Sequence, residues 1–224
     1  MKAGGKMRLI FDDAEITLTE ATLEKVLQEV ALLTRQANEG GRVVAHILVD
    51  GQDVADLEAF LRGRVYPPPE VIKITTLTPT ALVNEAISTA LTFLPSLHED
   101  ILQKAAKLIQ GQNIGGDSWG RFLEGLDWLN SLLAAVLQHY HLTEPKKKEV
   151  SFLAEELRQS LREMAAAWEQ GDVVGLADAL EYRLAPLIDD YLAFFTSLSI
   201  VGGSASDSSS QPDLSQKRPP VTKV

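Results

Sequence analysis

Hydrophobic residues along the chain follow two different periods, and the change falls near residue 78. Before it, short apolar runs alternate with polar turns, which is typical of strands. After it, apolar residues recur every three or four positions, which is typical of amphipathic helices. From residue 201 large apolar residues are almost absent, and such a segment cannot bury enough surface to offset its ordering entropy. We therefore expect an α+β protein with a small sheet-containing domain at 7–77, a helical bundle at 78–200 and a disordered tail at 201–224.

The first part has the pattern of a small sheet with two helices. Apolar runs on either side of Asp12-Asp13-Ala14 predict a hairpin, and Thr19 is expected to cap the helix that follows. Asp50-Gly51 is a tight-turn signal between a long strand and a short return strand. The predicted strands of this part lie at 8–11, 15–18, 42–49, about 52–54 and 71–77.

The order of these elements resembles the β-grasp arrangement of ubiquitin-like domains. The resemblance covers roughly residues 7 to 77 and concerns the order and length of the elements. It implies a small scaffold that is used mostly for recognition.

Beyond residue 78 the apolar spacing predicts about four long helices. Thr78-Pro79 is a helix start, and Pro95 is expected to kink or break the first helix. Short connections between long amphipathic helices place consecutive helices antiparallel, so we expect an up-and-down bundle. The later helices are expected at about 118–141, at about 147–169 and after the cap residue Asp172.

The last helix carries two carboxylates among its apolar positions. One apolar seam runs through Val173, Ala177, Leu180, Leu184, Leu187 and Tyr191. A second seam, one residue along, places Asp178 and Glu181 between Val174 and Ala185. The spacing of three puts the two carboxylates on one helix face. Pro186 removes one backbone hydrogen bond and is expected to bend this helix.

Three interpretations of the carboxylate pair remain open. A buried carboxylate must be paired, hydrogen-bonded or protonated, so a structural role would pair each acid with a base of another helix, namely Arg121, Arg158, Arg162 or Lys107. A functional role would be metal binding or proton transfer. The two acids could also lie at the rim of the bundle, in contact with water.

The segment 171–187, GDVVGLADALEYRLAPL, resembles a segment of uncharacterised bacterial helical proteins. The shared pattern is Gly-Asp-x-x-x-Leu-Ala-Asp-x-Leu-Glu-Tyr-x-Leu-x-Pro-Leu, and it names no activity. In architecture and acidity the bundle is also similar to flagellar-export chaperones, which clasp helices of a partner.

Composition excludes several classes of function. The chain has no cysteine, which excludes disulfides and thiolate chemistry, and its net charge of −10 disfavours binding to phosphate backbones. No apolar run approaches the roughly 20 residues that span a bilayer, and the N-terminus lacks a secretory signal. We therefore expect a cytoplasmic protein with no nucleic-acid or membrane partner. No Glu-x-x-His pair or other metal or cofactor motif occurs, so no cofactor is expected.

These observations favour a non-enzymatic interaction, adaptor or chaperone-like protein that binds a protein partner through its bundle or a sheet edge. The expected binding residues are Trp128, Asp178, Glu181 and Tyr182, because Trp128 falls off the main apolar seam and exposed aromatic residues are enriched at interfaces. The alternative is a metal-dependent or hydrolytic enzyme that uses Asp178 and Glu181. The bundle could also form a homodimer, which the sequence leaves open.

Overall fold

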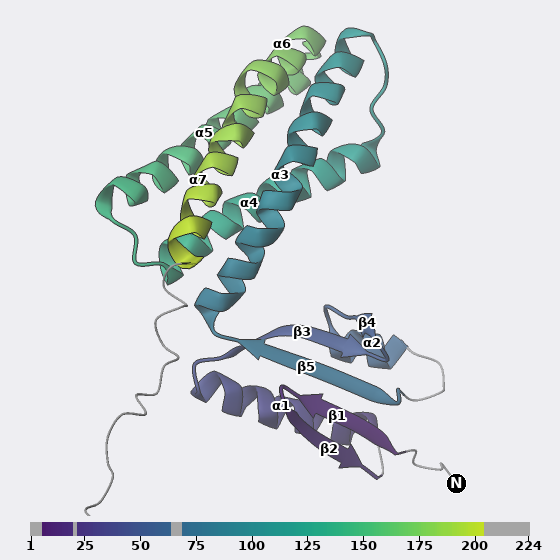
Figure 1. Cartoon of the computed structure of the whole chain (residues 1–224). Helices are drawn as coiled ribbons and strands as arrows, with labels where there is room; N and C mark the ends of the chain where they lie inside the picture. Colours follow the sequence, from purple (N-terminus) through teal and green to yellow (C-terminus); the bar gives the residue numbers. More distant parts are fainter. Residues whose placement is uncertain (1–5, 20–21, 64–68, 204–224) are drawn as a thin grey trace, which may run out of the picture. The chain divides into compact units, whose positions relative to one another are not determined.

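The computed structural model describes residues 6–19, 22–63 and 69–203 (Figure 1). It confirms the α+β class, because a small mixed sheet precedes a series of long helices. The chain packs into two compact units. The first consists of the stretch up to Ala86 together with Ser131–Lys147, and the second consists of Ile87–Asn130 together with the stretch from Lys148 onward. Of the predicted disordered tail, 204–224 lies outside the described residues, and the last helix continues to Gly203.

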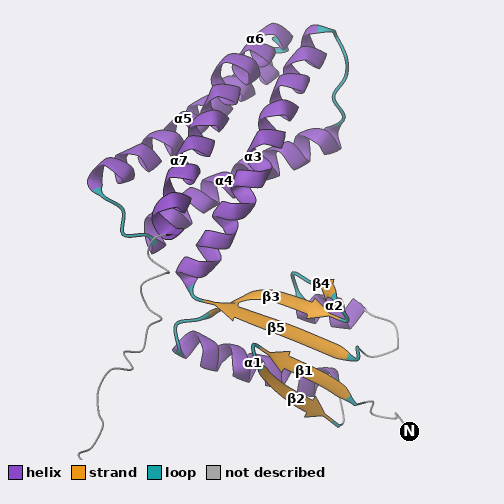
Figure 2. Ribbon diagram, viewed as in Figure 1, coloured by secondary structure: helices purple, strands orange, loops and turns teal. Residues whose placement is uncertain are grey.

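The first unit contains a five-stranded sheet (Figure 2). The strand order is β2-β1-β5-β3-β4, with β1 and β5 parallel at the centre and the other neighbours antiparallel. Its strands are β1 (Met7–Phe11), β2 (Ala14–Leu18), β3 (Val43–Val49), β4 (Gln52–Asp53) and β5 (Val71–Leu77), and its own helices are α1 (Leu23–Glu39) and α2 (Leu57–Gly63).

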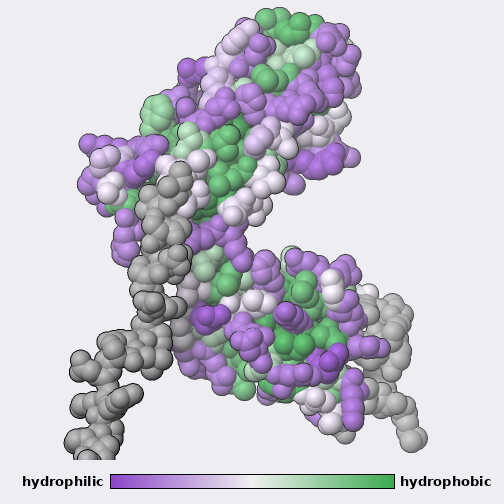
Figure 3. All heavy atoms as spheres, viewed as in Figure 1, coloured by the Kyte–Doolittle hydropathy of each residue, from purple (hydrophilic) through white to green (hydrophobic). Residues whose placement is uncertain are grey.

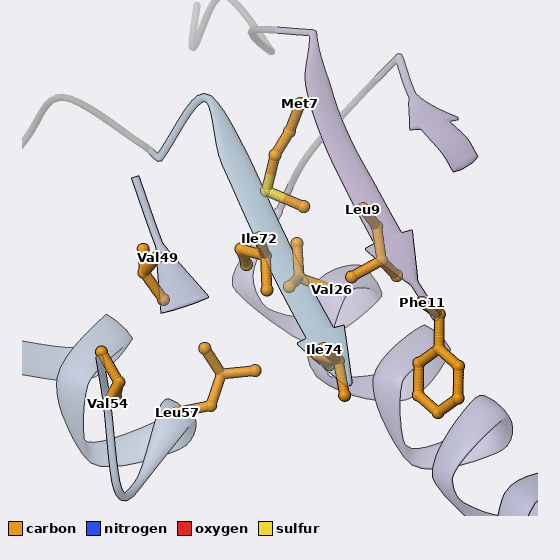
Figure 4. Close-up of a cluster of buried hydrophobic side chains, with 9 residues drawn as sticks. All are labelled: Met7, Leu9, Phe11, Val26, Val49, Val54, Leu57, Ile72 and Ile74. Atoms are coloured by element: carbon orange, nitrogen blue, oxygen red, sulfur yellow. The ribbon is translucent and has the colours of Figure 1, made fainter. Parts of the chain in front are cut away.

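One face of the sheet forms the core of this unit (Figure 4). Alternate residues of a strand point to the same face, so every second side chain of β1 and β5 is buried against α1 and α2. Each fully buried aliphatic side chain contributes roughly 1.5–3 kcal/mol. The buried residues are Met7, Leu9, Phe11, Val26, Val49, Val54, Leu57, Ile72 and Ile74.

The cap of α1 differs from the prediction. Thr22, not Thr19, is the N-cap residue, and its hydroxyl accepts a hydrogen bond from the backbone N–H of Lys25 at 3.3 Å. Both threonines have the chemistry of a cap, but only the one directly before the first helical turn can reach its free N–H groups.

A polar network ties the β1–β2 turn to the end of β5. Asp12, at φ 51°, accepts hydrogen bonds from the backbone N–H and the hydroxyl of Thr76, each at 2.7 Å. Arg42 donates to the Thr76 hydroxyl at 2.8 Å and to its carbonyl at 2.5 Å. Burial alone would raise the pKa of Asp12, but the hydrogen bonds from Thr76 and the charge of Arg42 outweigh it and hold the pKa below its usual value. The charged carboxylate is therefore the form that the fold stabilises.

We expect Asp12→Asn to lower the free energy of unfolding by about 1 kcal/mol at pH 7, because hydrogen bonds to a charged acceptor are lost. A carboxylate whose pKa is lowered by folding stabilises above its ordinary pKa, and this contribution disappears as pH falls through the folded value. Urea unfolding of both chains should thus give a constant difference from pH 7 to about 5, which shrinks below about pH 4. A difference independent of pH would contradict this role.

The remaining helices are long and follow one another in opposite directions (Figure 1). They are α3 (Pro79–Ile109), α4 (Gly116–His139), α5 (Glu144–Gln170) and a last segment made of α6 (Val173–Asp178), the π-helix η1 (Ala179–Leu184) and α7 (Ala185–Gly203). Pro95 does not break α3, which is continuous across it.

The last segment contains one residue more than a regular α-helix would need. The N–H of Ala185 bonds to the carbonyl of Leu180, five residues back, directly before Pro186. The buried residues of this segment come in pairs, and successive pairs begin three, five and three residues apart. In a regular α-helix, successive buried positions on one face are three or four residues apart. These pairs are Leu176 with Ala177, Ala179 with Leu180, Leu184 with Ala185, and Leu187 with Ile188.

The extra residue overturns the predicted second seam. If the seam is extended backward from α7 with a regular helical period, the buried positions before η1 are each found one residue earlier than expected. Asp178 and Glu181 therefore face outward, and Val174 is exposed as well. After η1 the seam holds, with Ala185, Ile188 and Phe195 buried. The first seam is confirmed except at Val173, which is exposed.

Candidate functional site

An apolar groove lies between α4, α5 and the start of α6, within the second unit. We call it the tryptophan groove. Its volume is about 300 Å³, which is at the lower end of the range for ligand pockets. The residues that line it are Trp119, Leu123, Leu161, Met164, Ala165, Trp168, Glu169 and Leu176.

The groove is built on a chain of aromatic rings that leads from the core to the surface. Phe122 is buried, and Trp119 packs edge to face against it with ring centroids 5.6 Å apart. Trp168 packs edge to face against Trp119, also at 5.6 Å, and is 60% exposed. Edge-to-face pairs add roughly 0.5–1.5 kcal/mol to simple burial, so Trp119 holds the exposed ring in one place.

The turn after α5 fixes the position of Trp168. Gly171, at φ 68°, ends the helix, and its N–H bonds to the carbonyl of Trp168 at 3.1 Å. The next N–H, of Asp172, bonds to the carbonyl of Ala167 at 2.9 Å, which completes a Schellman motif. The Asp172 carboxylate then accepts from the N–H of Gly175 at 2.8 Å and starts α6, so that Leu176 reaches the groove.

Exposed apolar residues extend the groove over the beginning of α6. Val173 and Val174 are exposed, and Val173 lies one turn before Leu176 on the same helix face. Leu123 is exposed on the opposite wall. Figure 3 shows hydrophobic surface at the end of the bundle that α6 occupies. A contiguous exposed apolar patch is a mark of binding surfaces in soluble proteins.

The structure gathers three of the four predicted binding residues on one exposed face. Asp178, Glu181 and Tyr182 all point outward at η1, and Tyr182 is 65% exposed. A hydrogen bond to Glu181, with the negative charges of Glu181 and Asp178, raises the pKa of Tyr182. Within the described residues neither carboxylate forms an ion pair, so the predicted pairing with a base of another helix is not present.

Trp128 lies on a different helix from those three residues. It is half-buried on α4 and packs edge to face against Phe93, with ring centroids 5.9 Å apart. Phe93 in turn lies over Gly125, where an added Cβ atom would approach its ring to 2.9 Å. Trp128 is thus partly committed to internal packing, whereas Trp168, which the sequence analysis did not select, is the more exposed indole.

The described residues contain neither a metal-ligand cluster nor a membrane-spanning helix. No group of three or more His, Asp or Glu side chains there is arranged to hold a metal ion. None of the described helices is both long and apolar enough to cross a membrane.

One comparison with known proteins gives a match. Residues 85–193 match the family model of a domain of unknown function, DUF8042. The match covers slightly less than half of the chain and includes the whole tryptophan groove and η1. The segment 171–187 lies inside it, in agreement with the predicted link to an uncharacterised family. No curated protein and no solved structure matches the chain.

Proposed function

We propose that this chain is a non-enzymatic interaction or adaptor protein whose bundle captures an apolar segment of a protein partner in the tryptophan groove. The observation that carries the proposal is Trp168, which is 60% exposed although an apolar groove lies beside it. Trp119 holds it there, and tryptophan is the residue most enriched among the energetic anchors of interfaces.

The groove supports this function better than the predicted sites do. A rigid indole beside a preformed apolar hollow loses little side-chain entropy on binding, which favours affinity. Asp178, Glu181 and Tyr182 remain predicted contacts at a neighbouring stretch of the last helical segment. β2 also forms an edge of the sheet, but its residues line neither the tryptophan groove nor the two hollows beside α1 and α2.

The sheet unit supports a scaffolding role in the same proposal. We infer a β-grasp arrangement from the strand order β2-β1-β5-β3-β4, its central parallel pair and the helix that follows the first hairpin. Such a unit would present the bundle or bind a second component. A cytoplasmic location belongs to the same proposal, as does a chaperone-like action on the partner.

The enzymatic alternative requires a third acid or imidazole beside Asp178 and Glu181. The described residues contain no such metal-holding group, and both carboxylates face outward rather than into a pocket. No observation favours this alternative over binding.

Trp168→Ala is expected to abolish partner capture while the melting temperature changes by no more than a few degrees, because most of this side chain is already in contact with water. The measurement is affinity capture of the tagged full-length chain from its native cells, identification of the captured protein, and reconstitution from purified components. Phe152→Ala is the matched control, since Phe152 is an equally exposed aromatic residue of α5 outside the groove. Equal affinity of the purified partner for the wild-type chain and Trp168→Ala would overturn the proposal.

A further inference from the structure

The tryptophan groove lies in a strongly acidic part of the molecule. Residues 87–130 and 148–203 contain 15 acidic and 7 basic side chains, a net charge of −8. From this charge and the apolar lining we propose that the occupant of the groove is a basic amphipathic helix of the partner protein. This inference rests on the proposed function and specifies the chemistry of the partner.

The apolar part of the groove suits one face of a helix. Side chains at positions i, i+3, i+4 and i+7 of an amphipathic helix form a row of anchors that fits a groove between two helices. Trp168 and Leu123 stand on either side of the groove, and Leu176 lines it from α6, with Val173 one turn beyond. The anchors would enter between these walls.

Backbone hydrogen bonding favours a helix over an extended segment. The walls of the groove belong to α4, α5 and α6, whose backbone groups are bonded within their own helices. An extended peptide would find no sheet edge here, and its N–H and C=O groups would be buried without partners. A helix satisfies its own backbone groups before it docks.

The charges around the groove favour a basic polar face. Glu169 is the only charged residue in the lining, and within the described part of the chain it forms no ion pair. Several of the seven bases are already engaged by acids. Lys104 pairs with Asp100, Arg158 and Arg162 with Glu155, and Arg183 with Glu156 and Glu163. Because each of these pairs also neutralises an acid, the net charge of −8 is carried by the other side chains. Together with Glu169 in the lining, this charge favours cations and disfavours acidic helices at the groove.

The test uses three labelled helical peptides of about 18 residues, or five turns. They share one Leu/Phe face and carry Lys, Gln or Glu on the polar face. Fluorescence anisotropy with the full-length chain should show the lysine peptide binding at least about tenfold more tightly than the glutamate peptide. This preference should weaken as salt rises from about 50 to 500 mM.

Two variants of the chain locate the binding. Trp168→Ala should lower the affinity for the lysine peptide at least about tenfold, whereas Phe152→Ala should leave this affinity unchanged. Glu169→Lys should narrow the difference in affinity between the lysine and glutamate peptides, because it weakens binding of the lysine peptide and strengthens binding of the glutamate peptide.

The outcomes separate the two proposals. Trp168-dependent binding of all three peptides with equal affinity would refute the basic partner and leave the interaction function standing. Binding of the lysine peptide that Trp168→Ala does not change would mean that surface charge alone attracts it, which refutes this inference. If no peptide binds and the chain instead self-associates in a Trp168-dependent manner, the occupant is a second copy. If no peptide binds and the chain stays monomeric, both proposals fall.

Discussion

Deletion of Glu181 is expected to lower the free energy of unfolding by about 3 kcal/mol, and Pro186→Ala in the same chain is expected to recover most of that loss. The deletion removes the extra residue of η1, so the buried pairs on either side regain the spacing of a continuous α-helix. In that helix Pro186 lacks an N–H and clashes with the carbonyl four residues back, which costs about 3 kcal/mol. Urea unfolding followed by circular dichroism measures both steps.

Deletion of Asp190 provides the matched control, because it also removes one exposed acid from the same segment. Asp190 lies in the regular α-helix α7, so its loss rotates everything that follows by about 100°. Tyr191, Phe194 and Phe195 would then leave the core, and we expect this chain not to fold. If the two deletions are equally damaging, and Pro186→Ala rescues neither, η1 does not absorb a residue in the way that the burial pattern indicates.

Asp100→Ala is expected to cost about 3 kcal/mol, and Lys104→Met in a separate chain less than about 1 kcal/mol. The side chain of Lys104 is only 4% exposed, and its ammonium nitrogen lies 2.7 and 2.6 Å from the two carboxylate oxygens of Asp100. The same nitrogen lies 5.4 Å from the ring centroid of Phe122. Removing the aspartate leaves a buried positive charge without its partner, which is strongly destabilising.

The expected difference in stability between Asp100→Ala and Lys104→Met tests whether Lys104 is a buried charge that depends on Asp100. Asp100 is 45% exposed, so in Lys104→Met its carboxylate turns to water and the methionine fills the space of the lysine stem. The double variant Asp100→Ala with Lys104→Met should therefore be more stable than Asp100→Ala alone. Chemical denaturation of the four chains completes a double-mutant cycle. If Asp100→Ala costs as little as Lys104→Met is expected to cost, Lys104 reaches water when its partner is absent and the arrangement is refuted.

The sequence predicted the sheet unit well because its signals are local. The structure has a turn at Asp50-Gly51, as predicted, and β5 coincides with the predicted strand 71–77. Glycine and aspartate tolerate the left-handed backbone that such turns need, so residue type and structure are tied closely there. The cap of α1 was misplaced because two threonines stand three residues apart and a single position decides between them.

The bundle was harder to predict where its geometry departs from a regular helix. A seam extrapolated with period 3.6 cannot include the extra residue of η1. It therefore assigns Asp178 and Glu181 to an apolar seam and leaves their burial open, whereas in the structure both are exposed. The periodicity did not single out Lys104, although it is buried and follows the buried Ile101 by three positions on the same helix face. Trp168 lies on the apolar seam of α5 but in the last turn of that helix, and it is largely exposed. The apolar period cannot show whether the neighbouring helices still cover the seam at the end of a helix.

The pairing of the first strand with the last has a consequence for synthesis on the ribosome. β1 lies between β2 and β5 in the sheet, and β5 begins at Val71, some sixty residues after β1. At roughly 5–20 residues per second, the nascent chain waits about 3–12 s between making the two strands. During that interval the β1–β2 hairpin offers an open edge to any neighbouring nascent chain, and the arrival of β5 closes it.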